Sequence, residues 1–184
     1  AFVKRNREAN NFNLHMVFRG NPGTGKNEVA RIMSRILYEV GSLKEAKLVE
    51  TNANDFISLY VGGTGKKTEE KIREAFGGVL FIDEAYSLVG EGSHSYGDEA
   101  IATLIKEMED KRGQFVCILA GYKDEMNYLI ETNPGFKSRI QFYLDFDDYN
   151  REELKEIAKK FLSDDDYTIE DDAMDLLLDI SDYY

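Results

Sequence analysis

The sequence is poor in cysteine, histidine and long apolar runs, and each shortage excludes a class of protein. A single cysteine, Cys117, cannot form an internal disulfide, so we expect a reducing compartment. Cys117 lies in an apolar run, where we expect it to pack in the core as an unreactive thiol. The only histidines, His15 and His94, are far apart in the sequence and have no cysteine nearby, which argues against a zinc site.

No apolar stretch is long enough for a membrane span. The longest, "FVCILAG" at 115–121, falls well short of the roughly 20 residues that a spanning helix needs. The amino-terminal residues do not resemble a signal peptide. We therefore expect a soluble, cytoplasmic protein without a membrane partner. Because the chain does not begin with Met, we also expect a fragment or a processed chain.

Basic residues are scarce at the carboxyl-terminal end. The net charge is −12, and residues 145–184 hold 4 Lys and Arg against 15 Asp and Glu. Residues 1–144 hold 19 and 20, which is nearly neutral. Nucleic-acid binding needs a basic face, so we expect no nucleic-acid partner. We interpret the acidic end as the solvated surface of a small helical piece.

Short apolar runs alternate with amphipathic segments along most of the chain. Apolar runs predict strands at 15–18, 47–50, 78–83, 115–120 and 142–146. Helical spacing predicts helices at 27–41, 67–76 and 98–110, the first of them capped by Gly41. The alternation predicts the α/β class, with a doubly wound, parallel, five-stranded sheet.

The pattern changes at Asn150, where two helical segments, 150–162 and 169–180, follow without a strand. Asn150 can cap the first of them, with Glu153 completing a capping box. We therefore predict an α/β domain at 1–148 and a partial helical domain at 149–184, too small to fold alone.

Residues 20–27, "GNPGTGKN", match the phosphate-binding loop G-x-x-x-x-G-K-[ST] except at the last position. A predicted strand precedes the loop and a predicted helix follows it, as the motif requires. Glycines let backbone N–H groups surround phosphates, and the helix dipole favours the negative charge. The candidate nucleotide-binding residues are Asn21, Pro22, Gly23, Thr24, Gly25, Lys26, Asn27 and Glu28.

Asn27 stands where a hydroxyl residue would bind Mg²⁺. Its amide carbonyl is also an oxygen ligand but lies one atom farther from the backbone. Glu28 suits the helix dipole, yet it would repel phosphate if it pointed inward. We expect nucleotide binding to persist and metal positioning to suffer. A second glycine- and lysine-containing stretch, "GGTGKKT" at 62–68, has no apolar strand before it and is not predicted to bind phosphate.

"GVLFIDEA" at 78–85 is an apolar strand that ends in two acids. In combination with a phosphate loop this is the Walker B pattern. Asp83 is then the candidate Mg²⁺ ligand, and Glu84 is the candidate general base that polarises the attacking water.

Five stretches resemble, in order, the AAA+ ATPases, and most closely the group that contains CbbX and stage V sporulation protein K. They are "HMVFRGNPGTGK", "YVGGTGKKT", "GVLFIDEAYSL", "AGYKDEM" and "NPGFKSRI". The resemblance covers roughly residues 14–160. It implies a P-loop NTPase sheet with a helical lid, ATP and Mg²⁺ as ligands, and a homohexameric ring with ATP sites between subunits.

The resemblance also implies roles for single residues. Tyr60 matches the aromatic pore-loop position that grips a protein client, and Arg139 matches the arginine finger that reaches a neighbouring subunit's γ-phosphate. Tyr122 lies near the sensor 1 position and is a candidate nucleotide contact, although the family often has Asn or Thr there. Tyr149 and Asn150 would open the lid. Tyr60 and Arg139 could each be an ordinary surface residue instead.

Three departures from the family pattern bear on activity: Asn27, the end of the chain before a sensor 2 arginine, and the lack of an apolar stretch in "AFVKRNREANN". They lead us to expect an incomplete ATP pocket. Three functions therefore stay open. The first is an ATPase that remodels a protein client in a ring. The second is a nucleotide-binding assembly module with little hydrolysis. The third is a small-molecule kinase, which would need no Tyr60 or Arg139.

Overall fold

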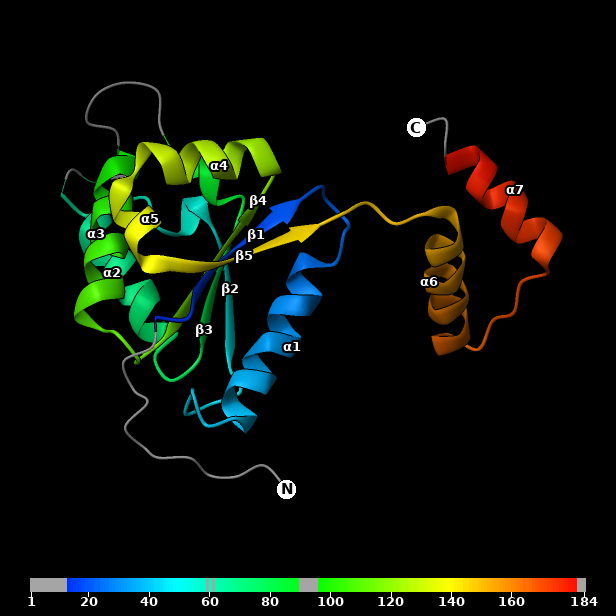
Figure 1. Ribbon diagram of the computed structural model, residues 1–184, viewed down its shortest axis with the longest axis horizontal. Helices are drawn as coiled ribbons and strands as arrows, with labels where there is room; N and C mark the ends of the chain where they lie inside the picture. Colours follow the sequence, from blue (N-terminus) through cyan, green and yellow to red (C-terminus); the bar gives the residue numbers. More distant parts are fainter. Residues whose placement is uncertain (1–12, 59, 61, 90–95, 182–184) are drawn as a thin grey trace. The chain divides into compact units, whose positions relative to one another are not determined.

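The computed structural model describes residues 13–58, 60, 62–89 and 96–181. Its five strands form one all-parallel sheet in the order β2-β3-β4-β1-β5 (Figure 1). This confirms the predicted α/β fold class, and every strand begins and ends within two residues of its predicted run. The strands are β1 (His15–Gly20), β2 (Leu48–Asn52), β3 (Val79–Asp83), β4 (Val116–Gly121) and β5 (Ile140–Phe146).

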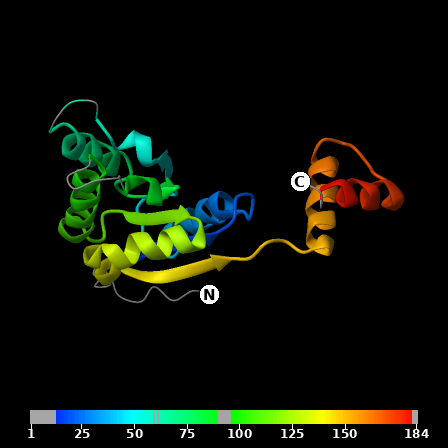
Figure 2. The ribbon, with the colours of Figure 1, turned by 90° about the horizontal axis from the view of Figure 1, so that it is seen from above.

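Helices cover both faces of this sheet, as a doubly wound sheet requires. They are α1 (Lys26–Glu39), α2 (Thr64–Glu74), α3 (Tyr96–Asp110), α4 (Lys123–Thr132) and α5 (Pro134–Arg139). Two short 3₁₀ helices, η1 (Ala53–Asp55) and η2 (Ala85–Leu88), follow β2 and β3. Figures 1 and 2 show α1 lying apart from the group formed by α2 to α5.

Alternate side chains of the buried strands build two separate cores, because successive residues of a strand point to opposite faces. On one face Val17, Leu80 and Leu119 pack with residues of α2 to α5. On the other, Phe18 and Phe81 pack with residues of α1. The central strands are buried on both sides, which explains why their sequences are continuous apolar runs rather than alternating ones.

The helix ends follow local sequence signals where those signals are strong. Gly41 adopts φ +78° directly after α1, and the next two backbone N–H groups return to the Leu37 carbonyl, so the predicted glycine cap is confirmed. The sequence pattern predicted no helix between β4 and β5, but α4 and α5 lie there. Both are short, and Pro134 begins α5 only two residues after α4 ends, so neither has an extended helical repeat.

The chain divides into two compact units, and the boundary in the sequence lies between Phe146 and Asp147. The predicted boundary was 148/149. The second unit contains α6 (Arg151–Asp164) and α7 (Asp171–Ser181). Asn150 caps α6 in the predicted capping box with Glu153. Exposed ion pairs join the two helices, among them Lys159 with Asp171 at 2.8 Å, and such pairs add little stability.

Among the residues that the structure describes, no helix has the length and apolar character needed to cross a bilayer.

His15 and Cys117 form a buried polar contact at the amino end of the sheet. The Cys117 backbone N–H donates to His15 Nδ1 at 2.9 Å. Burial is the main cause that lowers the pKa of His15 to about 4, and the charges of Arg112 and Arg139 act in the same direction, whereas the Met108 carbonyl opposes them. Burial raises the pKa of the Cys117 thiol to about 12, which agrees with the predicted unreactive core cysteine.

The buried His15 should make folding stability depend on pH. Between its unfolded pKa of 6.5 and its folded pKa of about 4, the unfolded chain binds more protons, so the unfolding free energy rises with pH. The contribution, about 3 kcal/mol, is complete above pH 6.5 and is lost as the pH falls towards 4. His15→Gln, which keeps an acceptor for Cys117, should flatten this part of the profile in urea unfolding at pH 4 to 7. Equal pH slopes for both proteins would contradict this account.

Candidate nucleotide site

A pocket of about 390 Å³ opens at the edge of the sheet where β1, β3 and β4 end. Its size is typical of a site for a small molecule. Nine of its lining residues were predicted from the sequence as site residues: Pro22, Gly23, Gly25, Lys26, Asn27, Glu28, Asp83, Glu84 and Tyr122. Gly20, Tyr86 and Gly121 complete the lining.

Two glycines give the loop after β1 its shape. A Cβ atom on Gly20 would lie 2.3 Å from the Phe146 carbonyl oxygen of β5, so no side chain fits where the loop leaves the sheet. Gly25 adopts φ +85° immediately before α1, a conformation that glycine takes without strain. The first backbone N–H groups of α1 consequently face the pocket region, where the helix dipole favours an anion.

Lys26 is the buried cation of this loop. Its Nζ donates to the Gly20 carbonyl at 2.8 Å and to the Asn21 carbonyl at 2.6 Å. Burial lowers the pKa of Lys26, and the charge of Asp83 partly offsets that effect. The ammonium group is therefore held between the loop and the end of β3, where it can bind an anionic ligand.

Asp83 and Glu84 bring two carboxylates to the same pocket. Asp83 ends β3, and its Oδ1 accepts the Glu84 backbone N–H at 3.0 Å. Glu84 itself adopts φ 49°, which is uncommon for a residue with a side chain. Backbone strain of this kind is found often at functional sites, and here it falls on a residue that lines the pocket.

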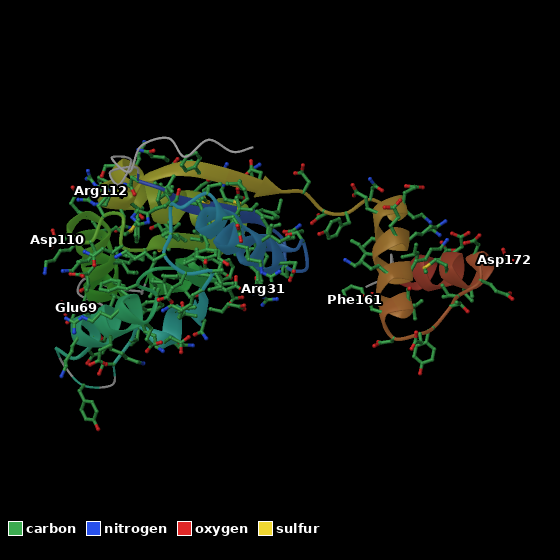
Figure 3. All side chains as sticks on the ribbon, turned by 90° about the horizontal axis from the view of Figure 1, so that it is seen from below. Arg31, Glu69, Asp110, Arg112, Phe161 and Asp172 are labelled. Atoms are coloured by element: carbon green, nitrogen blue, oxygen red, sulfur yellow. The ribbon has the colours of Figure 1, made fainter. Side chains whose placement is uncertain are left out.

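The first turn of α1 contains Asn27, which departs from the phosphate-loop motif, and Glu28, whose charge could repel phosphate. Asn27 is exposed and lines the pocket in place of a hydroxyl residue. Glu28 also lines it, but its carboxylate pairs with Arg31 at 3.1 Å. Arg31, labelled in Figure 3, also binds Glu50 of β2 at 2.6 Å. The negative charge of Glu28 is therefore partly balanced within the chain.

Three predicted site residues do not line the pocket. Asn21 and Thr24 shape the loop instead, because the Thr24 hydroxyl donates to the Asn21 carbonyl at 2.8 Å. Arg139 lies directly before β5, at the opposite edge of the sheet. Its Nη1 donates to the Gly135 carbonyl at 3.0 Å, and its Nε lies 3.4 Å from a carboxylate oxygen of Glu109.

Three pocket residues were not among the predicted site residues: Gly20, which begins the phosphate-loop motif, and Tyr86 and Gly121, which lie outside it. Tyr86 lies in η2, three positions after Asp83, and Gly121 is the last residue of β4. Both stand next to motif residues in the sequence, but only the packing of η2 against β4 brings them together. The only sequence signal for the Tyr86 ring and the Gly121 backbone as parts of the pocket was therefore their closeness to the motif residues.

The stretch "GGTGKKT" forms no phosphate cradle. Its Thr64 begins α2, and Lys67 Nζ donates to the backbone carbonyl of Ile57 at 2.8 Å. Thr64 Oγ1 accepts the Ser58 backbone N–H at 3.1 Å. These contacts join Ile57 and Ser58 to the first turn of α2, and the side chain of nearby Tyr60 is 81% exposed.

No group of three or more His, Cys, Asp or Glu side chains gathers as a metal cluster within the described ranges, and His94 lies outside them. The pocket does bring together the two side chains predicted as Mg²⁺ ligands, Asp83 and Asn27. Mg²⁺ in nucleotide sites uses one or two protein carboxylates together with substrate phosphates and waters. This donor set therefore fits Mg²⁺ bound with a nucleotide.

Comparison with known proteins identifies a family and several relatives that are similar in sequence to this chain. The family described as "ATPase family associated with various cellular activities (AAA)" matches residues 16–147. Stage V sporulation protein K of Bacillus subtilis is 45% identical over 87% of this chain and 50% of its own length. Protein CfxQ of Xanthobacter flavus is 50% identical over 87% and 51%. Protein CbbX of Cereibacter sphaeroides is 46% identical over 87% and 52%.

The chain spans about half the length of these curated relatives. Among solved structures it is similar to the FIGL-1 AAA domain in complex with ADP, with a TM-score of 0.55 and 20% identity over 81% of this chain and 48% of the other. It is also similar to a DNA replication initiation factor, with a TM-score of 0.62 and 14% identity over 90% and 50%. At these identities the structures support the fold alone.

Lys26 should dominate the binding of a phosphorylated ligand, because it is the side-chain cation that lines the pocket. Lys26→Ala should lower the affinity for ATP and ADP by about ten- to a hundredfold, as expected for a lost charge-assisted contact. Isothermal calorimetry measures this directly. Lys66→Ala is the matched control, since Lys66 is exposed in the "GGTGKKT" stretch and should leave both affinities unchanged. Equal losses in the two variants would contradict the assignment of the phosphate loop.

Proposed function

The chain belongs to the AAA family of ATPases, and from this premise we propose that it hydrolyses ATP in a homo-oligomeric ring, with six subunits expected, to remodel a protein client. The observation that carries the proposal is the division of the candidate residues between the two edges of the sheet. Lys26, Asp83 and Glu84 line the pocket at one edge, and Arg139 lies at the other.

In this proposal the pocket residues divide the work of hydrolysis. Lys26 and the backbone N–H groups of the loop bind the β- and γ-phosphates. Asp83, with the carbonyl of Asn27, would hold Mg²⁺, which neutralises charge on the phosphates when it is bound. The Glu84 carboxylate accepts a proton from the attacking water and orients it. Tyr122 contributes to the wall of the nucleotide site.

Arg139 is too far from the pocket of its own subunit to serve it. Strand β1 spans the distance between the two edges with six residues, which corresponds to about 20 Å. A finger at the amino edge can complete a site only on another copy of the chain. A head-to-tail contact of that kind closes into a ring when its rotation permits. The position of Arg139 therefore supports an active site shared between subunits.

Tyr60 is the proposed contact for the client. Its aromatic side chain is 81% exposed, while its backbone N–H donates to Ser58 Oγ at 3.1 Å and its carbonyl accepts the Gly63 N–H at 3.0 Å. A large aromatic group on an anchored segment suits a transient grip on an extended peptide. The client is proposed only as a protein, and the proposed location is the cytoplasm.

A second function is favoured by Asn27. If its amide holds Mg²⁺ poorly, the chain acts as a nucleotide-binding assembly module with little hydrolysis. The pairing of Glu28 with Arg31 favours nucleotide binding in both functions, so binding alone does not distinguish them. Turnover does distinguish them.

Complementation between two inactive variants tests the shared site. Glu84→Gln should slow turnover while nucleotide affinity stays near the parental value, since the carboxylate acts on water. Arg139→Ala should also abolish turnover, by about a thousandfold or more, as fingers do elsewhere. Mixed rings should recover activity where an intact Arg139 from one subunit meets an intact Glu84 on the next. Mixed rings, verified by native mass spectrometry, that stay inactive would exclude a site completed in trans.

Replacement of Asn27 separates the two functions. Asn27→Thr should reduce the Mg²⁺ concentration needed for half-maximal turnover and raise the rate about tenfold, the value of one charge-assisted contact. In the presence of Mg²⁺ the substitution should also raise the affinity for ATP more than that for ADP, because the metal would neutralise the larger charge of the triphosphate. The measurement is ATPase activity titrated with Mg²⁺, with Asn54→Thr as a control outside the pocket. Slower turnover in Asn27→Thr than in the parent would refute the argument about the hydroxyl.

A further inference from the structure

The ends of α3 and α5 lie side by side and join Arg139 to an acid of its own chain. Gly135 lets the two helices approach closely, since a Cβ atom there would lie 2.6 Å from Cγ2 of Ile105. Glu109 and Arg139 each follow these residues by four positions, which is about one helical turn. At this second level Arg139 Nε lies 3.4 Å from a carboxylate oxygen of Glu109.

The guanidinium group of Arg139 is held through two of its three nitrogens. Nη1 donates to the Gly135 carbonyl at 3.0 Å and to Ser138 Oγ at 3.1 Å. Nε is buried and forms no hydrogen bond within the described residues, so the Glu109 carboxylate is the charge that balances it. Nη2 forms no hydrogen bond in the described part of the chain, and its two N–H donors remain for a ligand.

Glu109 is shared between two arginines. One of its carboxylate oxygens pairs with Arg112 and the other with Arg139. The hydrogen bond from Arg112 is the main cause that lowers the pKa of Glu109, and the charges of both arginines act in the same direction. The dipole of α3 disfavours an acid in its last turn, so Glu109 does not serve the helix itself. Without its charge the two arginines would repel each other, and Arg139 would gain rotamers.

We propose that Glu109 is a positioning residue for ATP hydrolysis, whose carboxylate holds Arg139 in the rotamer that reaches the γ-phosphate bound by the next subunit. The inference rests on the proposed function, since it requires Arg139 to act as a finger. Glu109 does not line the pocket of its own subunit, so its effect passes through Arg139. A side chain that is ordered before subunits meet loses less entropy when the shared site forms.

Steady-state ATP hydrolysis by the full chain tests this role. Glu109→Gln keeps the shape of the side chain and removes its charge, so kcat should fall about tenfold while KM for ATP changes less than about twofold. Asp110→Asn is the matched control, because it removes an exposed carboxylate from the same helix end without an ion pair among the described residues (Asp110 and Arg112 are labelled in Figure 3). Thermal unfolding verifies that both variants fold. An unchanged kcat in Glu109→Gln, or equal losses in the two variants, would overturn the proposal.

Mixed rings locate the effect on the chain that supplies the finger. In rings of Glu84→Gln and Arg139→Ala subunits, the first kind supplies the working finger and the second the working pocket. Glu109→Gln on the Glu84→Gln chain should lower the recovered rate about tenfold, whereas on the Arg139→Ala chain it should have no effect. Equal losses from both placements would contradict positioning, because a general structural effect does not depend on which chain carries the substitution.

The Arg139 side chain also gives a readout that needs no turnover. Its Nε–H signal in heteronuclear NMR spectra of the nucleotide-free chain is assigned by its loss in Arg139→Ala. Exchange of this buried proton with solvent should be about tenfold faster in Glu109→Gln than in the unsubstituted chain or in Asp110→Asn. Equal exchange rates in all three proteins would show that Glu109 does not hold the side chain.

The two levels of inference fail differently. Absence of turnover in the unsubstituted chain would overturn the proposed ATPase mechanism together with this role. A parental rate in Glu109→Gln, in a chain that Arg139→Ala inactivates, would overturn the role of Glu109 alone.

Discussion

The parallel pairing of five strands is the constraint on which the rest of this structure depends. Because all strands run in one direction, the residues that follow β1, β3 and β4 reach the same edge of the sheet. The register places Asn52 opposite Asp83 and Arg19 opposite Gly121, so the strand ends are level across the sheet. Segments separated by some sixty to one hundred residues in sequence thereby line one pocket. For the same reason Arg139, which directly precedes β5, lies at the amino ends of the strands.

The polarity of the sheet also separates Arg139 from the pocket residues, since it places them at opposite ends of the strands. The phosphate loop needs the helix N-terminus and the backbone N–H groups that follow β1. Arg139 needs an anchor, and it receives one from the end of α3 through Glu109, which is also paired with Arg112 (labelled in Figure 3). These contacts within the chain restrict the rotamers of the Arg139 side chain. The cost is a buried Nε without a hydrogen bond inside the described residues.

The sequence predicted those features whose physics is local. The phosphate loop, the acids after β3, the glycine cap at Gly41 and the capping box at Asn150 each depend on residues a few positions apart. The strands were also predictable, since burial on both faces leaves a continuous apolar run. The short helices α4 and α5 lack such a repeat and were not predicted. Contacts between elements, such as Glu28 with Arg31 and Glu50, depend on packing that no local pattern encodes.

The end of β4 illustrates most clearly what a residue-by-residue transfer of roles cannot predict. The resemblance to AAA+ proteins indicated Tyr122 as a nucleotide contact, because that family often has a polar side chain near the end of this strand. In the structure the preceding residue is Gly121, and its missing side chain admits the ring of Tyr86 from a different element. The wall of the pocket at the end of β4 is therefore built by two elements, and comparison of one strand residue by residue does not reveal the contact between them.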